Sequence, residues 1–305
     1  MPRAWLLILL CGSTIITINM GLRQGFGLFL PPISEQLGTG RELFALAIAI
    51  QNLAWGASSP FFGGLADRYG ARYITAIGGL IYVLGMVTMG LALTGEAVIL
   101  GQFLIGIGLG GAGFSVVLGA VGQAVPAEKR SFALGIVTAG GSFGPFAFVP
   151  VASFFLDSFG VTTAMLGLAA IAATMIGLAF GLRPPRDDSG GGQMMAQTLW
   201  AALNEAATHR GYVLLTIGFF VCGFQVVFIA THLPAYLQDF GIDQRYAAWS
   251  LALVGLFNIF GSLTAGWLGG RMSKRICLSY IYTARSLVMI AFLLLPISGE
   301  LSLVF

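Results

Sequence analysis

The sequence predicts an all-α integral membrane protein with many spanning helices. Only 9% of its 305 residues are charged and 57% are hydrophobic, and the mean hydropathy is +0.90. Soluble domains carry about 25% charged residues, so this balance excludes an ordinary soluble fold. Apolar runs of about 20 residues, the length that crosses the hydrocarbon core, recur along the whole chain.

These runs divide the chain into nine expected spans and the start of a tenth. The spans lie near residues 4–33, 43–65, 72–93, 97–123, 131–156, 161–182, 211–237, 246–269 and 276–296, and 301–305 begin the tenth. One polar stretch, 183–210, separates the sixth span from the seventh. We therefore expect a six-helix part at 1–182, a cytoplasmic linker at 183–210 and a second part at 211–305. Residues 194–207 of the linker are expected to form an amphipathic helix on the membrane surface.

The basic residues predict the orientation in the membrane. With a cytoplasmic N-terminus, eleven of the fifteen Lys and Arg residues fall in cytoplasmic segments, and only Arg41 and Arg245 fall in outer loops. Positive charge concentrates on the cytoplasmic side of multi-pass proteins. We expect a multi-pass protein of the plasma (inner) membrane with its N-terminus inside. The net charge of +3 comes from short loops and predicts contact with membrane lipids, not nucleic acid.

Residues 63–72, Gly-Gly-Leu-Ala-Asp-Arg-Tyr-Gly-Ala-Arg, connect two spans and must turn the chain tightly. The first two glycines are expected to let two helices approach closely, and Gly70 is expected to adopt a positive φ. Asp67 is positioned to cap the next helix. Arg68 and Arg72 add positive charge on the same side of the membrane.

This stretch resembles the loop between helices 2 and 3 of the major facilitator superfamily, Gly-x-Leu-Ala-Asp-Arg-x-Gly-x-Arg/Lys. Every fixed position of that pattern is met. The resemblance implies the major facilitator fold, with two pseudo-repeated six-helix halves that rock around a central site. It also implies a conformational gate at this loop, formed by Gly63, Asp67, Arg68, Gly70 and Arg72.

An internal repeat supports the two-half architecture. At a fixed offset of 203 residues the loop recurs as 266–275, Gly-Trp-Leu-Gly-Gly-Arg-Met-Ser-Lys-Arg. Gly266, Arg271 and Arg275 thus join the expected gate. By the repeat, three more spans should follow residue 305, so we expect the second half to be incomplete, holding helices 7–9 and the start of helix 10.

Two arginines, Arg23 and Arg285, fall inside expected spans, and no Asp or Glu clearly does. A guanidinium in hydrocarbon costs several kcal/mol, so it should face a polar cavity or a partner. The natural partner for Arg23 is an incoming anion, which a guanidinium holds bidentately. Alternatively, Arg23 snorkels to the outer surface. Arg285 either reaches the central cavity or braces its helix through backbone carbonyls and tyrosine hydroxyls, with Tyr282 one turn earlier.

Uncharged polar side chains and one histidine complete the expected binding site. His232 could carry a proton beside the anion, or serve as a hydrogen-bonding residue at a helix end. The amide side chains inside the spans, and Trp55 in the second span, could line a cavity. Interhelical hydrogen bonds explain their presence about as well. The candidate substrate-binding residues are Arg23, Gln24, Asn52, Gln225, His232, Asn258 and Arg285.

Several glycines have an expected role in helix packing. The run between Gly106 and Gly113 in the fourth span predicts close helix contacts, not a nucleotide loop, because no strand precedes it. Gln102 stands near the place where the resembled family has an arginine. Gly144 and Pro145 predict a kink in the fifth span.

The residues around Arg23 to Pro32 and 231–237 resemble bacterial carriers close to the monocarboxylate and oxalate/formate carriers. We expect a secondary active transporter of a small, monocarboxylate-like organic anion, working by symport or antiport with protons as a candidate coupling ion. The alternatives are a drug or metabolite efflux carrier and a non-transporting membrane sensor of the same fold. An enzyme is not expected, because the chain has two histidines and no His/Asp/Glu cluster. We expect a monomer without metal or cofactor.

Overall fold

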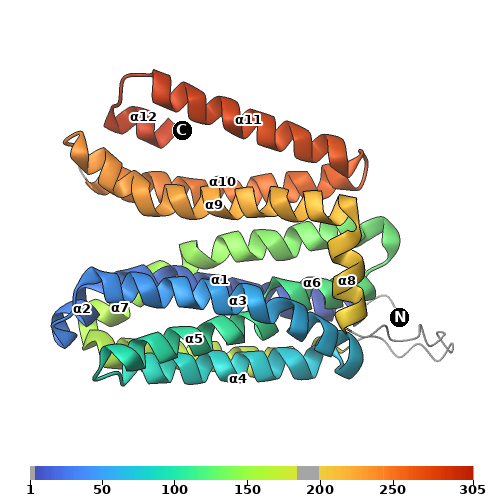
Figure 1. Ribbon diagram of the computed structural model, residues 1–305, viewed down its shortest axis with the longest axis horizontal. Coiled ribbons are helices and arrows are strands. Elements are labelled where there is room, and N and C mark those ends of the chain that lie inside the picture. The colour runs from blue at the N-terminus through green and yellow to red at the C-terminus, as the bar shows by residue number, and fades with distance from the viewer. Residues whose placement is uncertain (1–3, 184–198, 243, 305) are drawn as a thin grey trace. The chain divides into compact units, whose positions relative to one another are not determined.

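The computed structural model describes residues 4–183, 199–242 and 244–304, and every regular element within these ranges is helical. The chain divides into two compact units, residues 1–190 with 258–271 and residues 191–257 with 272–305. Figure 1 shows the order of the helices.

The first unit contains the helices that correspond to the first six expected spans. They are α1 (Ala4–Gly25), the 3-10 helix η1 (Phe26–Phe29), α2 (Leu30–Leu37), α3 (Arg41–Tyr69), α4 (Ala71–Gly90), α5 (Gly95–Ala112), α6 (Phe114–Ala124) and α7 (Ala127–Ala179). The expected first span is therefore not one continuous helix. Pro31 and Pro32 occupy the first turn of α2, where the missing proline N–H is not needed.

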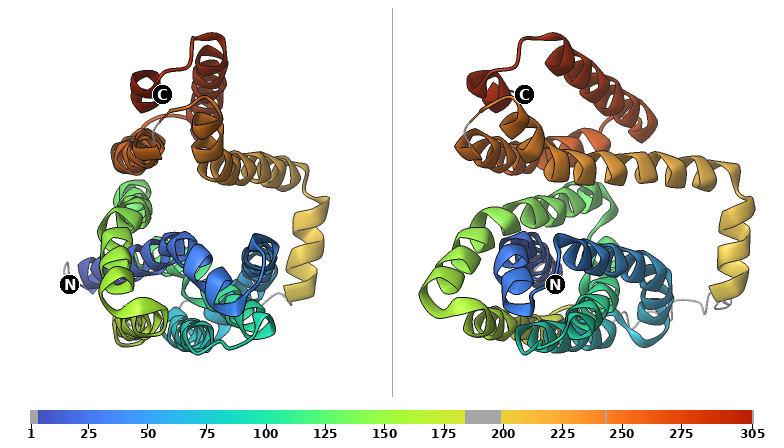
Figure 2. Two further views of the ribbon diagram at one scale, coloured as in Figure 1. Left: turned by 90° about the vertical axis from the view of Figure 1, so that its left-hand side faces the viewer. Right: turned by 60° about the vertical axis from the view of Figure 1, so that its left-hand side comes forward.

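Helix α7 contains both the fifth and the sixth expected spans. Its backbone departs from helical dihedral angles only at Gly160, where φ is 76° and ψ is 176°. Figure 2 shows the two arms of α7 running in opposite directions. Pro145 lies inside the first arm, where the residues keep helical dihedral angles, and the predicted kink at Gly144 and Pro145 stays a prediction.

The second unit consists of apolar helices joined by short turns. It contains α8 (Leu199–Thr208), α9 (Arg210–Asp239), the first part of α10 (Gln244–Gly269), α11 (Lys274–Leu294) and α12 (Gly299–Val304). Helices α9, α10 and α11 correspond to the seventh, eighth and ninth expected spans. The expected surface helix at 194–207 is helical from Leu199, and 194–198 lie outside the described residues.

Five described helical segments are long and apolar enough to cross a membrane: 5–29, 71–90, 95–124, 127–179 and 274–294. Two shorter apolar segments lie at 210–226 and 253–269. Large hydrophobic side chains are exposed along these helices, Leu84 and Leu287 among them. Exposed apolar surface of this extent is suited to contact with lipid tails, so the protein is a multi-pass membrane protein.

Glycines bring the helices of the first unit into backbone contact. A Cβ at Gly108 of α5 would lie 2.6 Å from Tyr82 N of α4, and one at Gly85 of α4 would lie 2.7 Å from Gly101 O of α5. The predicted packing role of the glycine run in the fourth span is thus confirmed. The same kind of contact joins α1 to α7, because a Cβ at Gly21 would lie 2.5 Å from the carbonyl oxygen of Gly144.

Candidate functional site

Arg23 lies in the last turn of α1, and its side chain reaches α3. The guanidinium Nη2 donates a hydrogen bond of 2.7 Å to Asn52 Oδ1. The guanidinium carbon lies 4.9 Å from the centroid of the Trp55 ring, within the range of a cation–π contact. Residues 52 and 55 are three apart on α3, so both side chains project from the same side of that helix.

The orientation of the Asn52 side chain is fixed by its own helix. Its Nδ2 donates to the backbone carbonyl of Ile48, one turn earlier, at 2.9 Å. This bond directs Oδ1 toward Arg23. Helix α3 therefore offers the guanidinium one oriented acceptor and one aromatic face, and both are uncharged.

The positive charge of Arg23 has no carboxylate partner among the described residues; its recorded contacts are Asn52 and Trp55. Its Nε is buried and has no hydrogen-bond partner. The hydroxyl of Tyr82, a fully buried residue of α4, donates to the Asn19 carbonyl at 3.4 Å, and Tyr82 is near enough to interact electrostatically with Arg23. A partly buried cation without a counter-ion is unfavourable and favours an arriving anion.

Within the first unit, Asn52 is the expected binding residue that contacts Arg23. Gln24 on α1 and Asn258 on α10 are exposed. In the second unit, Gln225 of α9 has a buried Oε1 without a partner. His232 lies on α9, but its side chain is outside what the structure describes.

Arg285 of α11 contacts α9 within the second unit. Its Nη1 lies 3.9 Å from Cys222 Sγ, and the hydroxyl of Tyr282 donates to the Gly218 carbonyl at 2.7 Å. This arrangement matches the bracing alternative more closely than the cavity alternative, although the thiol takes the place of a carbonyl. Its assignment to the substrate site stays a prediction.

Two residues near Arg23 were absent from the expected binding set. Trp55 has a sequence signal, because it follows Asn52 by three residues on the same helix. Tyr82 has none, because an aromatic residue in an apolar helix does not reveal that it will face a cation on another helix.

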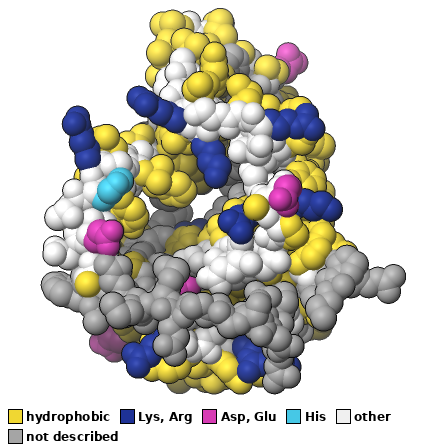
Figure 3. Space-filling model, turned by 90° about the vertical axis from the view of Figure 1, so that its right-hand side faces the viewer, with side chains coloured by type: hydrophobic (Ala, Val, Ile, Leu, Met, Phe, Trp, Pro, Cys, Tyr) yellow, Lys and Arg dark blue, Asp and Glu magenta, His cyan; other side chains and the backbone are white. Residues whose placement is uncertain are grey.

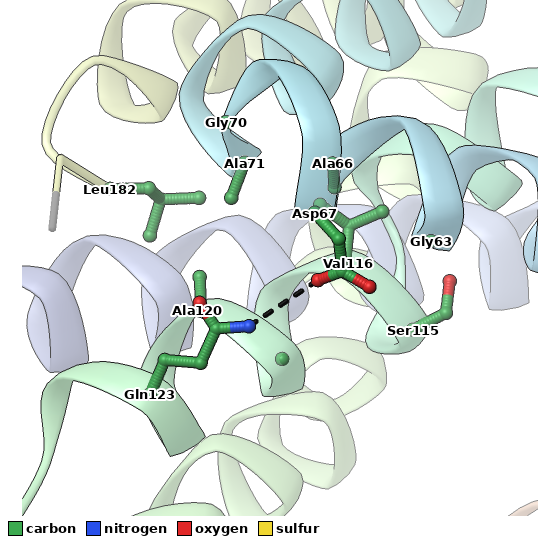
Figure 4. A pocket seen from close by; sticks show the side chains of 11 residues that line it. Gly63, Ala66, Asp67, Gly70, Ala71, Ser115, Val116, Ala120, Gln123 and Leu182 are labelled. Carbon is green, nitrogen blue, oxygen red and sulfur yellow. Dashed lines mark hydrogen bonds between the residues drawn. The ribbon is translucent and has the colours of Figure 1, made fainter. Parts of the chain in front are cut away.

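The turn at 63–72 forms a second candidate site. Gly70 has a φ of 94°, as predicted, and joins α3 directly to α4. Asp67 accepts a 3.3 Å hydrogen bond from Gln123 Nε2 of α6, at the edge of a cavity of about 410 Å³. Figure 4 shows the Gln123 amide directed at the Asp67 carboxylate. The cavity is lined mainly by small residues: Gly63, Ala66, Gly70, Ala71, Ser115, Gly119 and Ala120.

Two expectations for this turn are wrong. Asp67 does not cap α4, because α3 continues to Tyr69 and α4 has no side-chain cap. Gly63 makes no close helix contact in this conformation, since a Cβ there would have no neighbour within 4 Å. Its place in a gate stays a prediction.

The arginines of both loops stack on neighbouring aromatic rings. Arg68 lies 5.4 Å from the Tyr69 ring, Arg72 lies 4.3 Å from the Tyr73 ring, and Arg271 lies 4.0 Å from the Trp267 ring. Gly266 in the repeated loop accepts a 2.8 Å hydrogen bond from Ser131 Oγ within the first unit, and Arg275 is exposed on α11. Figure 3 shows several Lys and Arg side chains exposed on the face that it draws.

The family model described as Major Facilitator Superfamily matches residues 9–305. The chain belongs to this superfamily. Its fold agrees: a solved structure of the proton:xylose symporter XylE aligns with a TM-score of 0.64 at 14% identity, covering 87% of this chain and 68% of that one. The predicted family and fold class are confirmed, and they are those of membrane carriers.

Two curated relatives of this chain have names that indicate anion transport. Monocarboxylate transporter 13 of Rattus norvegicus is 26% identical over 261 residues, covering 82% of this chain and 57% of the relative. The oxalate:formate antiporter of Oxalobacter formigenes is 21% identical over 301 residues, covering 98% of this chain and 71% of the relative. The chain thus spans little more than half the length of the rat transporter.

Proposed function

We propose that this major facilitator protein is a secondary active transporter of a small organic anion of the monocarboxylate class. The observation that carries the proposal is the Arg23 guanidinium, placed between α1 and α3 with uncharged partners. The names of the rat and Oxalobacter relatives, which specify carriers of organic acids, support the same substrate class.

Arg23 would bind the carboxylate group of the substrate. A guanidinium presents N–H donors in a planar fork that matches a carboxylate, and such charge-assisted bonds are roughly twice as strong as neutral ones. The Trp55 ring supplies an apolar wall suited to a short aliphatic substrate. Alternating access would then expose this site to each side of the membrane in turn.

Proton coupling, the orientation and the location belong to the same proposal. A proton moving with a monocarboxylate makes the transported pair electrically neutral, and His232 is the candidate proton carrier. The basic ends of α3, α4 and α7, with Arg68, Arg72, Lys129 and Arg130, would face the cytoplasm. We place the protein in the plasma (inner) membrane as a monomer.

Uptake of a radiolabelled monocarboxylate into proteoliposomes tests the proposal. We expect Arg23→Ala to reduce the uptake rate by about 100-fold, the order of the loss when a buried charge partner is removed. Arg23→Lys should retain part of the rate, because an ammonium keeps the charge but not the fork. Arg130→Ala, an exposed position, is the matched control.

Three outcomes would contradict the proposal. Undiminished uptake by Arg23→Ala would remove Arg23 from the site. Flux of lipophilic drugs without flux of any monocarboxylate would favour the efflux alternative. Saturable binding of a monocarboxylate without flux would favour a non-transporting sensor.

A further inference from the structure

The guanidinium of Arg23 is only partly occupied by its hydrogen bond to Asn52. Nη2 is bonded to Asn52 Oδ1 at 2.7 Å, whereas Nε is buried and has no partner. Nη2 carries two hydrogens, and Asn52 uses one of them. The second hydrogen of Nη2 therefore remains available for an oxygen of a carboxylate.

Asn52 and a bound carboxylate would consequently approach the same nitrogen. Asn52 cannot turn away freely, because its Nδ2 is bonded to the Ile48 carbonyl at 2.9 Å. The amide oxygen of Asn52 thus stays beside the anion throughout binding. A negative charge on that oxygen would repel the anion, and more strongly than in bulk water because both side chains are partly buried.

We propose that Asn52 is a specificity-determining residue, whose neutral oxygen orients Arg23 for an anion without cancelling its positive charge. This inference rests on the proposed function, since it concerns the same site. Aspartate has the shape of asparagine. It cannot donate to the Ile48 carbonyl, but the attraction of Arg23 would hold its carboxylate on the same guanidinium nitrogen. Asparagine at this position therefore selects for anions.

The Asn52→Asp variant separates this role from a purely structural one. If Asn52 only holds Arg23 in place, aspartate is an equal or better acceptor, and alanine is the more harmful substitution. If Asn52 sets specificity, aspartate is the more harmful substitution and alanine the less harmful one. We expect the Kd for the monocarboxylate to rise by about 100-fold or more in Asn52→Asp. In Asn52→Ala, which loses one hydrogen bond to a charged group, we expect a rise of about tenfold.

The measurement is a titration of purified full chain with lactate, followed by intrinsic tryptophan fluorescence and by proteoliposome uptake. Asn204→Asp, at an exposed position on α8, adds the same charge elsewhere and should leave the Kd unchanged. The melting temperature without lactate should be at least as high in Asn52→Asp as in the parent protein. That result would show that weak binding does not come from unfolding.

The outcomes distinguish this inference from the proposed function. If the parent protein binds and transports lactate and Arg23→Ala does not, while Asn52→Asp binds as well as the parent or better than Asn52→Ala, the inference alone is overturned. If the parent binds no monocarboxylate, or Arg23→Ala binds it normally, both are overturned. Selective loss in Asn52→Asp supports both.

Discussion

Replacing Gly108 with alanine should force α4 and α5 apart. The new Cβ would lie 2.6 Å from Tyr82 N and 2.8 Å from Gly78 O, both backbone atoms of α4. Backbone atoms cannot rotate away as the end of a flexible side chain can. An ordinary contact begins at about 3.4 Å, so the two helices must separate by about 0.8 Å at this point.

The size of the effect follows from this displacement. A gap of about 0.5–1 Å removes a quarter to a half of the dispersion attraction between facing atoms. Neighbouring contacts share the loss, because the Gly85–Gly101 approach joins the same two helices. Overpacking of this kind costs about 1–3 kcal/mol.

Gly177→Ala is the matched control, because Gly177 lies in α7 with no neighbour within 4 Å of an added Cβ. Alanine there should be neutral or stabilising by up to about 1 kcal/mol through helix propensity. The assay is thermal unfolding of the purified protein in detergent, followed by tryptophan fluorescence. We expect Gly108→Ala to melt at least about 2 °C below Gly177→Ala. Equal melting temperatures would refute the claim that backbone contact holds α4 against α5.

Two further substitutions test local features of the fold. Gly70→Ala places a side chain at a φ of 94° and should lower the free energy of unfolding, measured by thermal unfolding, by about 1–2 kcal/mol. Gly223→Ala, in open space on α9, should not lower it, and equal free energies for the two variants would contradict the strain at Gly70. Ser250→Ala removes the buried 2.7 Å hydrogen bond from Ser250 Oγ to the Ser302 carbonyl. Losing this bond should destabilise α12 by about 1 kcal/mol, so amide hydrogen exchange in α12 should become about fivefold faster. Ser286→Ala, which loses only an exposed bond within its own helix, should leave that exchange unchanged, and an equal effect of both would count against the Ser250 contact.

The positions of the helices were largely predictable from the sequence, because the bilayer sets a minimum length for each apolar run. The residues at which the helices begin and end were less predictable. Asp67 looked like a helix cap because the loop was assigned to residues 63–72, whereas α3 extends to Tyr69 and places Asp67 inside its last turn. The break at Phe26–Phe29 has no signal in its own residues, since this stretch is as apolar as the helix before it. Its signal was the proline pair that opens α2.

The pairing at the candidate site was predictable only in part. The sequence identifies Arg23 as an uncompensated cation and Asn52 as a polar residue in an apolar helix, but they are 29 positions apart. Whether the two meet depends on how α1 and α3 are rotated about their axes. That rotation is set by packing, including the approach of Gly21 to Gly144. No periodicity in either helix alone specifies it.

The free energy of the Arg23 environment explains why neutral partners suit this position. An arginine at the centre of a membrane helix costs about 2.5–3.5 kcal/mol on insertion scales, which is an upper bound for Arg23 in the last turn of α1. A hydrogen bond to a charged group returns about 1.5–3 kcal/mol, and a cation–π contact adds about 0.5–1 kcal/mol. Asn52 and Trp55 together therefore offset most of the cost while leaving the charge intact. A carboxylate partner from the chain would stabilise Arg23 further, but it would occupy the fork that an anionic substrate needs.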